Sequence, residues 1–219
     1  MSIASKIKEI NSNLPETTRL VAISKFHPVE AIQEAYDAEQ RIFGESKVQE
    51  LVEKQNLLPK EIEWHFVGHL QTNKVKYIVP FISLIHSVDS IKLLEEINKQ
   101  AVKQNRTINC LLEIHIAQED TKYGFSIEEV RALFEKNAFG KFNHVRIKGF
   151  MGMASLTDDT QKIRKEFHSL SSLLNEIKEK YAPWIDSLSM GMTDDYPIAI
   201  EEGSTFIRIG SYIFGNRGL

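Results

Sequence analysis

One unit recurs eight times along the chain: a short apolar run, a break, and then an amphipathic stretch with helical spacing. The apolar runs predict strands over residues 20–24, 41–44, 64–68, 84–88, 110–116, 147–151, 187–190 and 206–209. The amphipathic stretches predict helices over residues 29–38, 46–57, 72–79, 91–103, 127–139, 159–181 and 194–202, and one or two turns over 211–214. Strands that alternate with helices are parallel and joined by right-handed crossovers. The sequence therefore predicts an α/β protein built as a closed (β/α)8 TIM barrel.

The length of the chain favours one barrel. Its 219 residues lie near the lower limit of this fold, roughly 200 residues, so little is left for a second domain. We expect residues 1–219 to form a single domain with an extra N-terminal helix, in which Ile alternates with Lys and Glu. The structural alternative is an open doubly wound sheet, which usually carries a glycine-rich loop after its first strand. Residues 24–28 contain no glycine, which favours the barrel.

The net charge and the cysteine content limit which binding partners and which cellular compartment we expect. A net charge of −3 gives no support to nucleic-acid binding, which usually shows as a basic excess. Cys110 is the only cysteine, so we expect a buried inert thiol, no internal disulfide and a cytoplasmic protein. No apolar stretch approaches the roughly 20 residues of a membrane-spanning helix. We expect a monomer with no membrane or nucleic-acid partner, and the spacing of the histidines predicts no metal site.

In a barrel of this type the chemistry belongs at the C-terminal ends of the strands, and Lys25 follows the first predicted strand. An ammonium group at the tip of a buried strand is costly, because desolvation disfavours its charged form and lowers its pKa. A lysine that loses its proton readily is a nucleophile for a carbonyl carbon, as in Schiff-base chemistry. The alternative is that Lys25 is only the first solvated residue beyond the strand.

The last two strand ends carry the ingredients of a phosphate site. Gly191 and Thr193 follow the seventh predicted strand, and Gly210 and Ser211 follow the eighth. Glycines permit close approach of the backbone, the hydroxyl groups are donors, and a short final helix would present free N–H groups. The alternative is that these residues are ordinary turn glycines and helix caps.

Arg208 lies between two isoleucines in the eighth predicted strand, where a charge needs a partner. That partner is either an acidic side chain such as Glu45 or a ligand. If Arg208 and Lys25 share the mouth of the barrel, the lysine yields its proton, because an arginine keeps its own.

Several motifs together resemble a known family. They are VAISK (21–25), FGESKVQE (43–50), WHFVGHLQTNK (64–74), SMGMTDD (189–195) and IEEGST (200–205), which runs on into RIGS (208–211) and IFG (213–215). On these motifs the chain resembles the pyridoxal-phosphate homeostasis proteins (the YggS/PROSC type), which are related in fold to the N-terminal barrel of bacterial alanine racemases. The resemblance covers nearly the whole chain.

The resemblance implies a pyridoxal 5'-phosphate site. Lys25 matches the lysine that forms the internal aldimine, and Arg208 matches the arginine beside the pyridine nitrogen. Ser46 stands where the family usually has asparagine, so a contact of that amide with the cofactor could be replaced by a bridging water. The implied cofactor-binding residues are Lys25, Ser46, Met151, Ser189, Met192, Thr193, Arg208, Gly210 and Ser211, with Thr193, Gly210 and Ser211 as the phosphate cradle.

For the function, the resemblance implies a non-catalytic protein that binds pyridoxal phosphate, buffers this reactive aldehyde and delivers it to PLP-dependent apo-enzymes. An arginine beside the ring nitrogen disfavours the pyridinium form, so the ring stabilises a substrate carbanion poorly. The expected single barrel also leaves no room for the second domain of an alanine racemase. Two alternatives stay open: a PLP-dependent amino-acid racemase-like enzyme, and a cofactor-free barrel such as a Schiff-base aldolase acting on a sugar phosphate.

Overall fold

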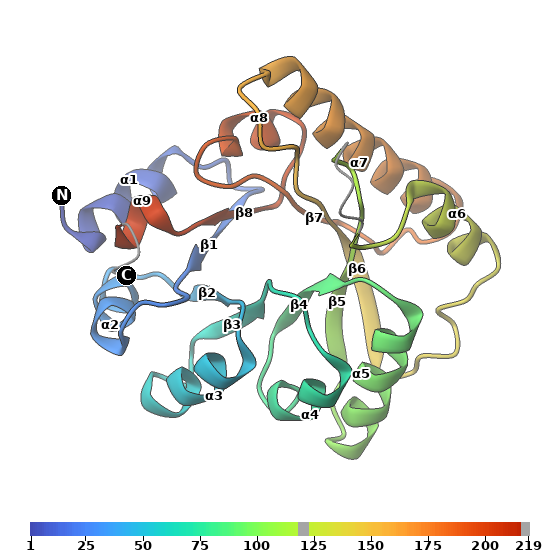
Figure 1. Ribbon diagram of the computed structural model, residues 1–219, viewed down its shortest axis with the longest axis horizontal. Helices are drawn as coiled ribbons and strands as arrows, with labels where there is room; N and C mark the ends of the chain where they lie inside the picture. The colour runs from blue at the N-terminus through green and yellow to red at the C-terminus, as the bar shows by residue number, and fades with distance from the viewer. Residues whose placement is uncertain (118–122, 216–219) are drawn as a thin grey trace.

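Eight parallel strands close into a barrel in the order of the sequence in the computed structural model, which describes residues 1–117 and 123–215 (Figure 1). The pairing of the first strand with the last closes the barrel and sets Val21 opposite Arg208. The predicted (β/α)8 barrel is therefore confirmed. The strands are β1 (Arg19–Ile23), β2 (Ile42–Glu45), β3 (Glu63–Phe66), β4 (Leu84–Val88), β5 (Ile108–Glu113), β6 (Val145–Met151), β7 (Ser187–Ser189) and β8 (Phe206–Ile209).

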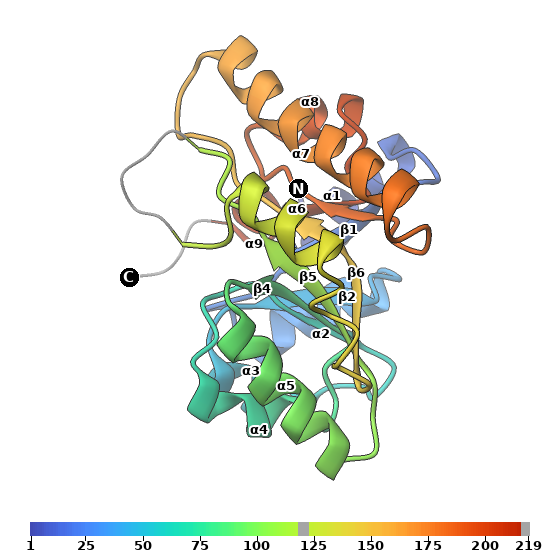
Figure 2. The same cartoon turned by 90° about the vertical axis from the view of Figure 1, so that its right-hand side faces the viewer.

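Helices surround the strands on the outside of the barrel (Figures 1 and 2). They are α1 (Ile3–Asn13), α2 (Val29–Asp37), α3 (Val48–Leu57), the 3-10 helix η1 (Thr72–Lys74), α4 (Val75–Ile78), α5 (Ile91–Lys103), α6 (Ile127–Glu135), α7 (Thr160–Lys180), α8 (Tyr196–Glu201) and α9 (Ser211–Phe214). The predicted N-terminal helix is α1, which lies beside α2 and α9. Ser90 and Ser126 cap α5 and α6, because their hydroxyl groups accept from the N–H three residues on.

Local backbone geometry explains where the elements depart from the predicted ranges. α6 ends before residue 139 because Asn137 adopts the left-handed conformation, with φ of 49°. α3 begins at Val48 rather than at residue 46 because Lys47 is extended, with φ of −124° and ψ of 125°. The helix predicted over 72–79 is a 3-10 turn followed by α4, and the one predicted from residue 194 begins at 196. β4 and β8 match their predicted ranges, whereas β5 covers 108–113 rather than 110–116.

Alternation along the strands divides the core into two regions. Outward-facing side chains, such as Leu20 of β1 and Phe43 of β2, pack against the helices. Inward-facing side chains form a second apolar cluster inside the barrel, made of Val21, Ile42, Leu84, Leu111, Met151 and Phe206. The interior also holds buried polar side chains, which are His65, His86, Ser189 and Arg208.

The structure also bears on the cysteine, on membrane-spanning helices and on metal sites. Cys110 is fully buried, and burial raises the pKa of its thiol, as predicted for an inert cysteine. No helix in the described ranges is long and apolar enough to span a bilayer. Within the same ranges, no group of three or more His, Cys, Asp or Glu side chains is arranged to hold a metal ion.

Candidate functional site

A cavity of about 220 Å³ opens at the C-terminal ends of β1 and β8. Six residues of the predicted cofactor-binding set line it, namely Lys25, Met192, Thr193, Arg208, Gly210 and Ser211. The remaining walls come from Ile23, His27, Val67, Met153 and Gly215. The structure thus brings the lysine, the arginine and the residues of the predicted phosphate cradle to one place.

Lys25 reaches this cavity because it continues the inward side of β1. Val21 and Ile23 belong to the apolar cluster inside the barrel, and successive inward positions along a strand are two residues apart. Lys25 is half-buried, so it ends the strand as a lining residue of the cavity rather than as a side chain in bulk solvent. Phe26 follows with φ of 67°, in the left-handed region, and turns the chain away from the strand toward α2.

Two hydroxyl groups and a glycine form another part of the cavity wall. Thr193 Oγ1 lies 3.3 Å from Ser211 Oγ. A Cβ atom on Gly210 would lie 2.9 Å from the carbonyl oxygen of Ile23, so the close approach of β1 and β8 requires glycine there. α9 begins directly after Gly210, and the first N–H groups of a helix have no partner within it. These donors together suit an anion with several oxygen acceptors, such as a phosphate group.

Arg208 supplies a fixed positive charge from the floor of the cavity. Its Nη1 donates to Ser189 Oγ at 2.6 Å, and its Nη2 donates to the Gly152 carbonyl at 3.2 Å. Burial lowers the pKa of Arg208 to about 10, and the negative charges of Asp195 and Glu113 oppose that shift. The guanidinium group therefore stays charged at neutral pH and is held in one orientation.

Glu45, one of the two kinds of partner predicted for Arg208, lies elsewhere. Its Oε1 accepts from Lys54 Nζ at 2.7 Å, on the side of β2 that faces α3. That alternative is wrong because alternation turns Glu45 out of the barrel, whereas Arg208 points inward.

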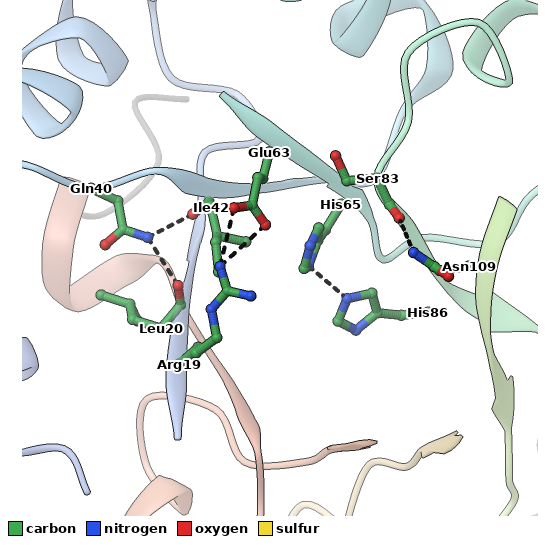
Figure 3. A network of polar contacts seen from close by, with 9 residues as sticks. All are labelled: Arg19, Leu20, Gln40, Ile42, Glu63, His65, Ser83, His86 and Asn109. Carbon is green, nitrogen blue, oxygen red and sulfur yellow. Dashed lines mark hydrogen bonds and ion pairs between the residues drawn. The ribbon is translucent and has the colours of Figure 1, made fainter. Parts of the chain in front are cut away.

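A line of buried hydrogen bonds continues from Arg208 into the barrel. Ser189 Oγ lies 2.8 Å from His86 Nδ1, and His86 Nε2 lies 2.9 Å from His65 Nδ1. Figure 3 shows the two imidazoles facing each other, with the ion pair of Arg19 and Glu63 nearby. Burial lowers the pKa of His65 to about 3 and that of His86 well below its usual value, so both rings are neutral.

One assignment of the protons satisfies every hydrogen bond along this line. Ser189 Oγ accepts from Arg208, so its own proton is available to His86 Nδ1. A neutral His86 then carries its proton on Nε2 and donates it to His65 Nδ1. In this assignment every donor points away from the cavity and each hydrogen bond has one proton.

Three predicted site residues do not line the cavity. Ser189 lies behind Arg208 and orients it. Met151 pairs with Ser189 across β6 and β7 and belongs to the apolar cluster inside the barrel, while Met153, two residues further on, lines the cavity. Ser46 lines a separate cavity of about 220 Å³ at the start of α3.

A larger cavity of about 440 Å³ adjoins the first and shares Val67, Met153 and Met192 with it. Glu113, at the end of β5, lines this second cavity, and burial together with the charge of Asp89 raises the pKa of its carboxyl group. Glu113 was not among the predicted site residues. The predicted strand over 110–116 placed it in mid-strand, whereas β5 ends at Glu113, and the C-terminal ends of the strands are where the site residues of such a barrel lie.

The fold and the first cavity define a class of protein. It is a (β/α)8 barrel whose mouth carries a lysine, an arginine and a group of hydroxyl donors that suits an anion. Residues 1–218 match the family described as alanine racemase, N-terminal domain. The pyridoxal phosphate homeostasis protein of Aquifex aeolicus is 38% identical over 200 residues, which cover 91% of this chain and 87% of that protein. The protein of the same name from Escherichia coli K12 is 36% identical over 207 residues, 93% of this chain and 87% of that protein. The chain belongs to the family of the pyridoxal phosphate homeostasis proteins.

Solved structures agree with this assignment. PipY of Synechococcus elongatus PCC7942, solved without PLP, is 35% identical, with a TM-score of 0.91 over 98% of this chain and 100% of that one. The PLP-bound form of PipY gives a TM-score of 0.88 at the same identity and coverage. Alanine racemase of Clostridium difficile 630 is 15% identical, with a TM-score of 0.74 over 98% of this chain and 56% of that one. At that identity the racemase shares the fold alone.

Proposed function

We propose that this protein binds pyridoxal 5'-phosphate in the 220 Å³ cavity, holds it as an imine on Lys25, and buffers and delivers it without catalysing a reaction. The observation that carries the proposal is that Lys25, Arg208 and the hydroxyl groups of Thr193 and Ser211 line one cavity. An amine for the aldehyde, a cation for the ring and donors for the phosphate are the three groups that this ligand needs. The names of the relatives and the PLP-bound PipY structure support the same ligand.

Each residue has a distinct role in this proposal. Thr193 and Ser211 donate to the phosphate oxygens, together with the first N–H groups of α9. Gly210 has no side chain, so the anion can approach the backbone at that position. Met192 forms an apolar wall, and Arg208 faces the ring nitrogen. Ser189 acts through Arg208, whereas contacts of Met151 and Ser46 with the ligand stay predictions.

Arg208 also supports the non-catalytic part of the proposal. Bound pyridoxal phosphate supplies an electrophilic carbon and a ring that can accept electrons. A guanidinium group beside the ring nitrogen disfavours the pyridinium form, and the ring is then a weak electron sink. Delivery to PLP-dependent apo-enzymes, a monomeric state and a cytoplasmic location belong to the same proposal.

The test is hydride trapping. Borohydride reduction of the loaded protein, followed by peptide mass spectrometry, should leave pyridoxyl phosphate on Lys25. Lys25→Ala should abolish the adduct, because no other amine lines this cavity among the described side chains. Lys47→Ala is the matched control, since Lys47 is exposed near the mouth and contacts the Phe26 ring. An adduct that persists at the same site in Lys25→Ala would contradict the proposal, and sustained α-hydrogen exchange of an L-amino acid in deuterated water would contradict its non-catalytic part.

A further inference from the structure

Lys54 is a buried ammonium group outside the cavity. Its side chain, on α3, is 6% exposed, which is rare for a lysine unless the charge is paired. Nζ donates to Glu45 Oε1 at 2.7 Å, to Glu50 Oε1 at 2.6 Å and to the Ser24 carbonyl at 2.7 Å. All three of its protons are therefore used.

Two of these contacts lead to the residues on either side of Lys25. The Ser24 carbonyl accepts directly from Lys54, and Ser24 Oγ donates to Glu45 Oε1 at 2.7 Å. On the other side, the Phe26 N–H donates to Glu50 Oε1 at 2.6 Å. One charge cluster, made of Lys54, Glu45 and Glu50, thus holds the chain immediately before and immediately after Lys25.

The turn that this cluster holds is unfavourable by itself. Phe26 has φ of 67°, in the left-handed region that is unfavourable for a residue other than glycine. Phe26 is 47% exposed, so burial of its side chain compensates for only part of this cost. The hydrogen bond from its N–H to a charged carboxylate is of the stronger kind and offsets this cost.

We propose that Lys54 and Glu50 are positioning residues for Lys25: they fix the backbone on both sides of it so that its amine enters the cavity. This inference rests on the proposed function only in taking Lys25 as the amine that captures the aldehyde. The cluster does not touch the ligand cavity, so its effect passes through the backbone of residues 24–26.

Glu50→Ala is the variant that tests the inference. Lys54→Met would leave the buried Glu45 carboxylate without its counter-ion, and the loss of one partner of a buried ion pair endangers folding. Glu50 is less buried, so its replacement leaves the Lys54–Glu45 pair intact and removes the anchor of Phe26. Glu53→Ala is the matched control, because Glu53 is exposed on the same helix.

Three measurements separate positioning from a merely structural role. In stopped-flow mixing, Glu50→Ala should capture pyridoxal phosphate about tenfold or more slowly, because a small misplacement of a reacting group has effects of this size. Its affinity for pyridoxine 5'-phosphate, which lacks the aldehyde, should stay that of the wild type. In the unloaded protein the Phe26 amide should exchange with deuterium faster, whereas Glu53→Ala should match the wild type in every assay.

The outcomes are distinct. Unchanged capture by Glu50→Ala, or an equal loss of capture and of pyridoxine phosphate affinity, would overturn the inference and leave the proposed function standing. If the wild type and Glu53→Ala form no hydride-fixable adduct, the proposed function fails and the inference fails with it. Partial recovery of capture by Glu50→Asp would add support, because a carboxylate near the Phe26 N–H is restored.

Discussion

The neutral imidazole of His65 makes the stability of this protein sensitive to acid. Burial lowers its pKa in the folded state to about 3, whereas an unfolded chain has a histidine pKa near 6.5. Above pH 6.5 both states are neutral, so the group contributes no pH dependence there. Between pH 6.5 and 3 the unfolded chain binds a proton that the folded protein does not bind, so the free energy of unfolding falls as the pH falls.

The size of the effect follows from the same two values. At pH 4 the unfolded histidine is about 2.5 units below its pKa, and each unit is worth about 1.4 kcal/mol. His65 should therefore remove about 3 kcal/mol of stability between pH 7 and pH 4, a large share of the 5–15 kcal/mol typical of a folded protein. His65→Asn removes the titrating group and keeps an oxygen where Nδ1 accepts from His86.

Urea unfolding at pH 7 and at pH 4, followed by circular dichroism, measures both values. His65→Asn should start from a lower stability at pH 7, but its loss on acidification should be about 3 kcal/mol smaller than that of the wild type. Ile32→Val is the control, because it removes one buried methyl group in α2 and should cost about 1 kcal/mol at both pH values. An acid-induced loss as large in His65→Asn as in the wild type would refute the reasoning.

Two further predictions concern the cavity. Arg208→Glu in the loaded protein should raise the pKa of the pyridine nitrogen, because a carboxylate favours the ring proton; an absorption spectrum with the wild-type pH dependence would count against the place assigned to Arg208. Gly210→Ala should lower stability by about 1–3 kcal/mol and weaken the binding of inorganic phosphate, because its Cβ would lie 2.9 Å from the Ile23 carbonyl and push β1 from β8. Urea unfolding and calorimetric titration check this, and wild-type values in both would contradict it.

The periodicity of the sequence was enough to predict the barrel because the fold repeats one local unit. Strand and helix periods are local properties, and closure follows once eight such units are counted. The same logic located Lys25, Arg208 and the two loops with Thr193 and Ser211, because the C-terminal ends of all barrel strands meet at one mouth.

Contacts set by barrel closure could not be predicted in this way. The line from Arg208 through Ser189 to His86 and His65 joins four different strands, and no local pattern links them. Met151 shows the limit within one strand. It ends β6, as the predicted range does, but its side chain belongs to the apolar cluster inside the barrel, and only the packing of that cluster shows how deep it lies.

The contact between β1 and β8 has a consequence for the life of the molecule. Lys25 lies just after β1, and Arg208 lies within β8. These two strands are hydrogen-bonded neighbours, although nearly all of the chain lies between them in the sequence. A nascent polypeptide still emerging from the ribosome has the first of these residues long before it has the second. On the proposed function, pyridoxal phosphate can therefore be held only after β8 has paired with β1, so a loaded molecule is one whose barrel has closed.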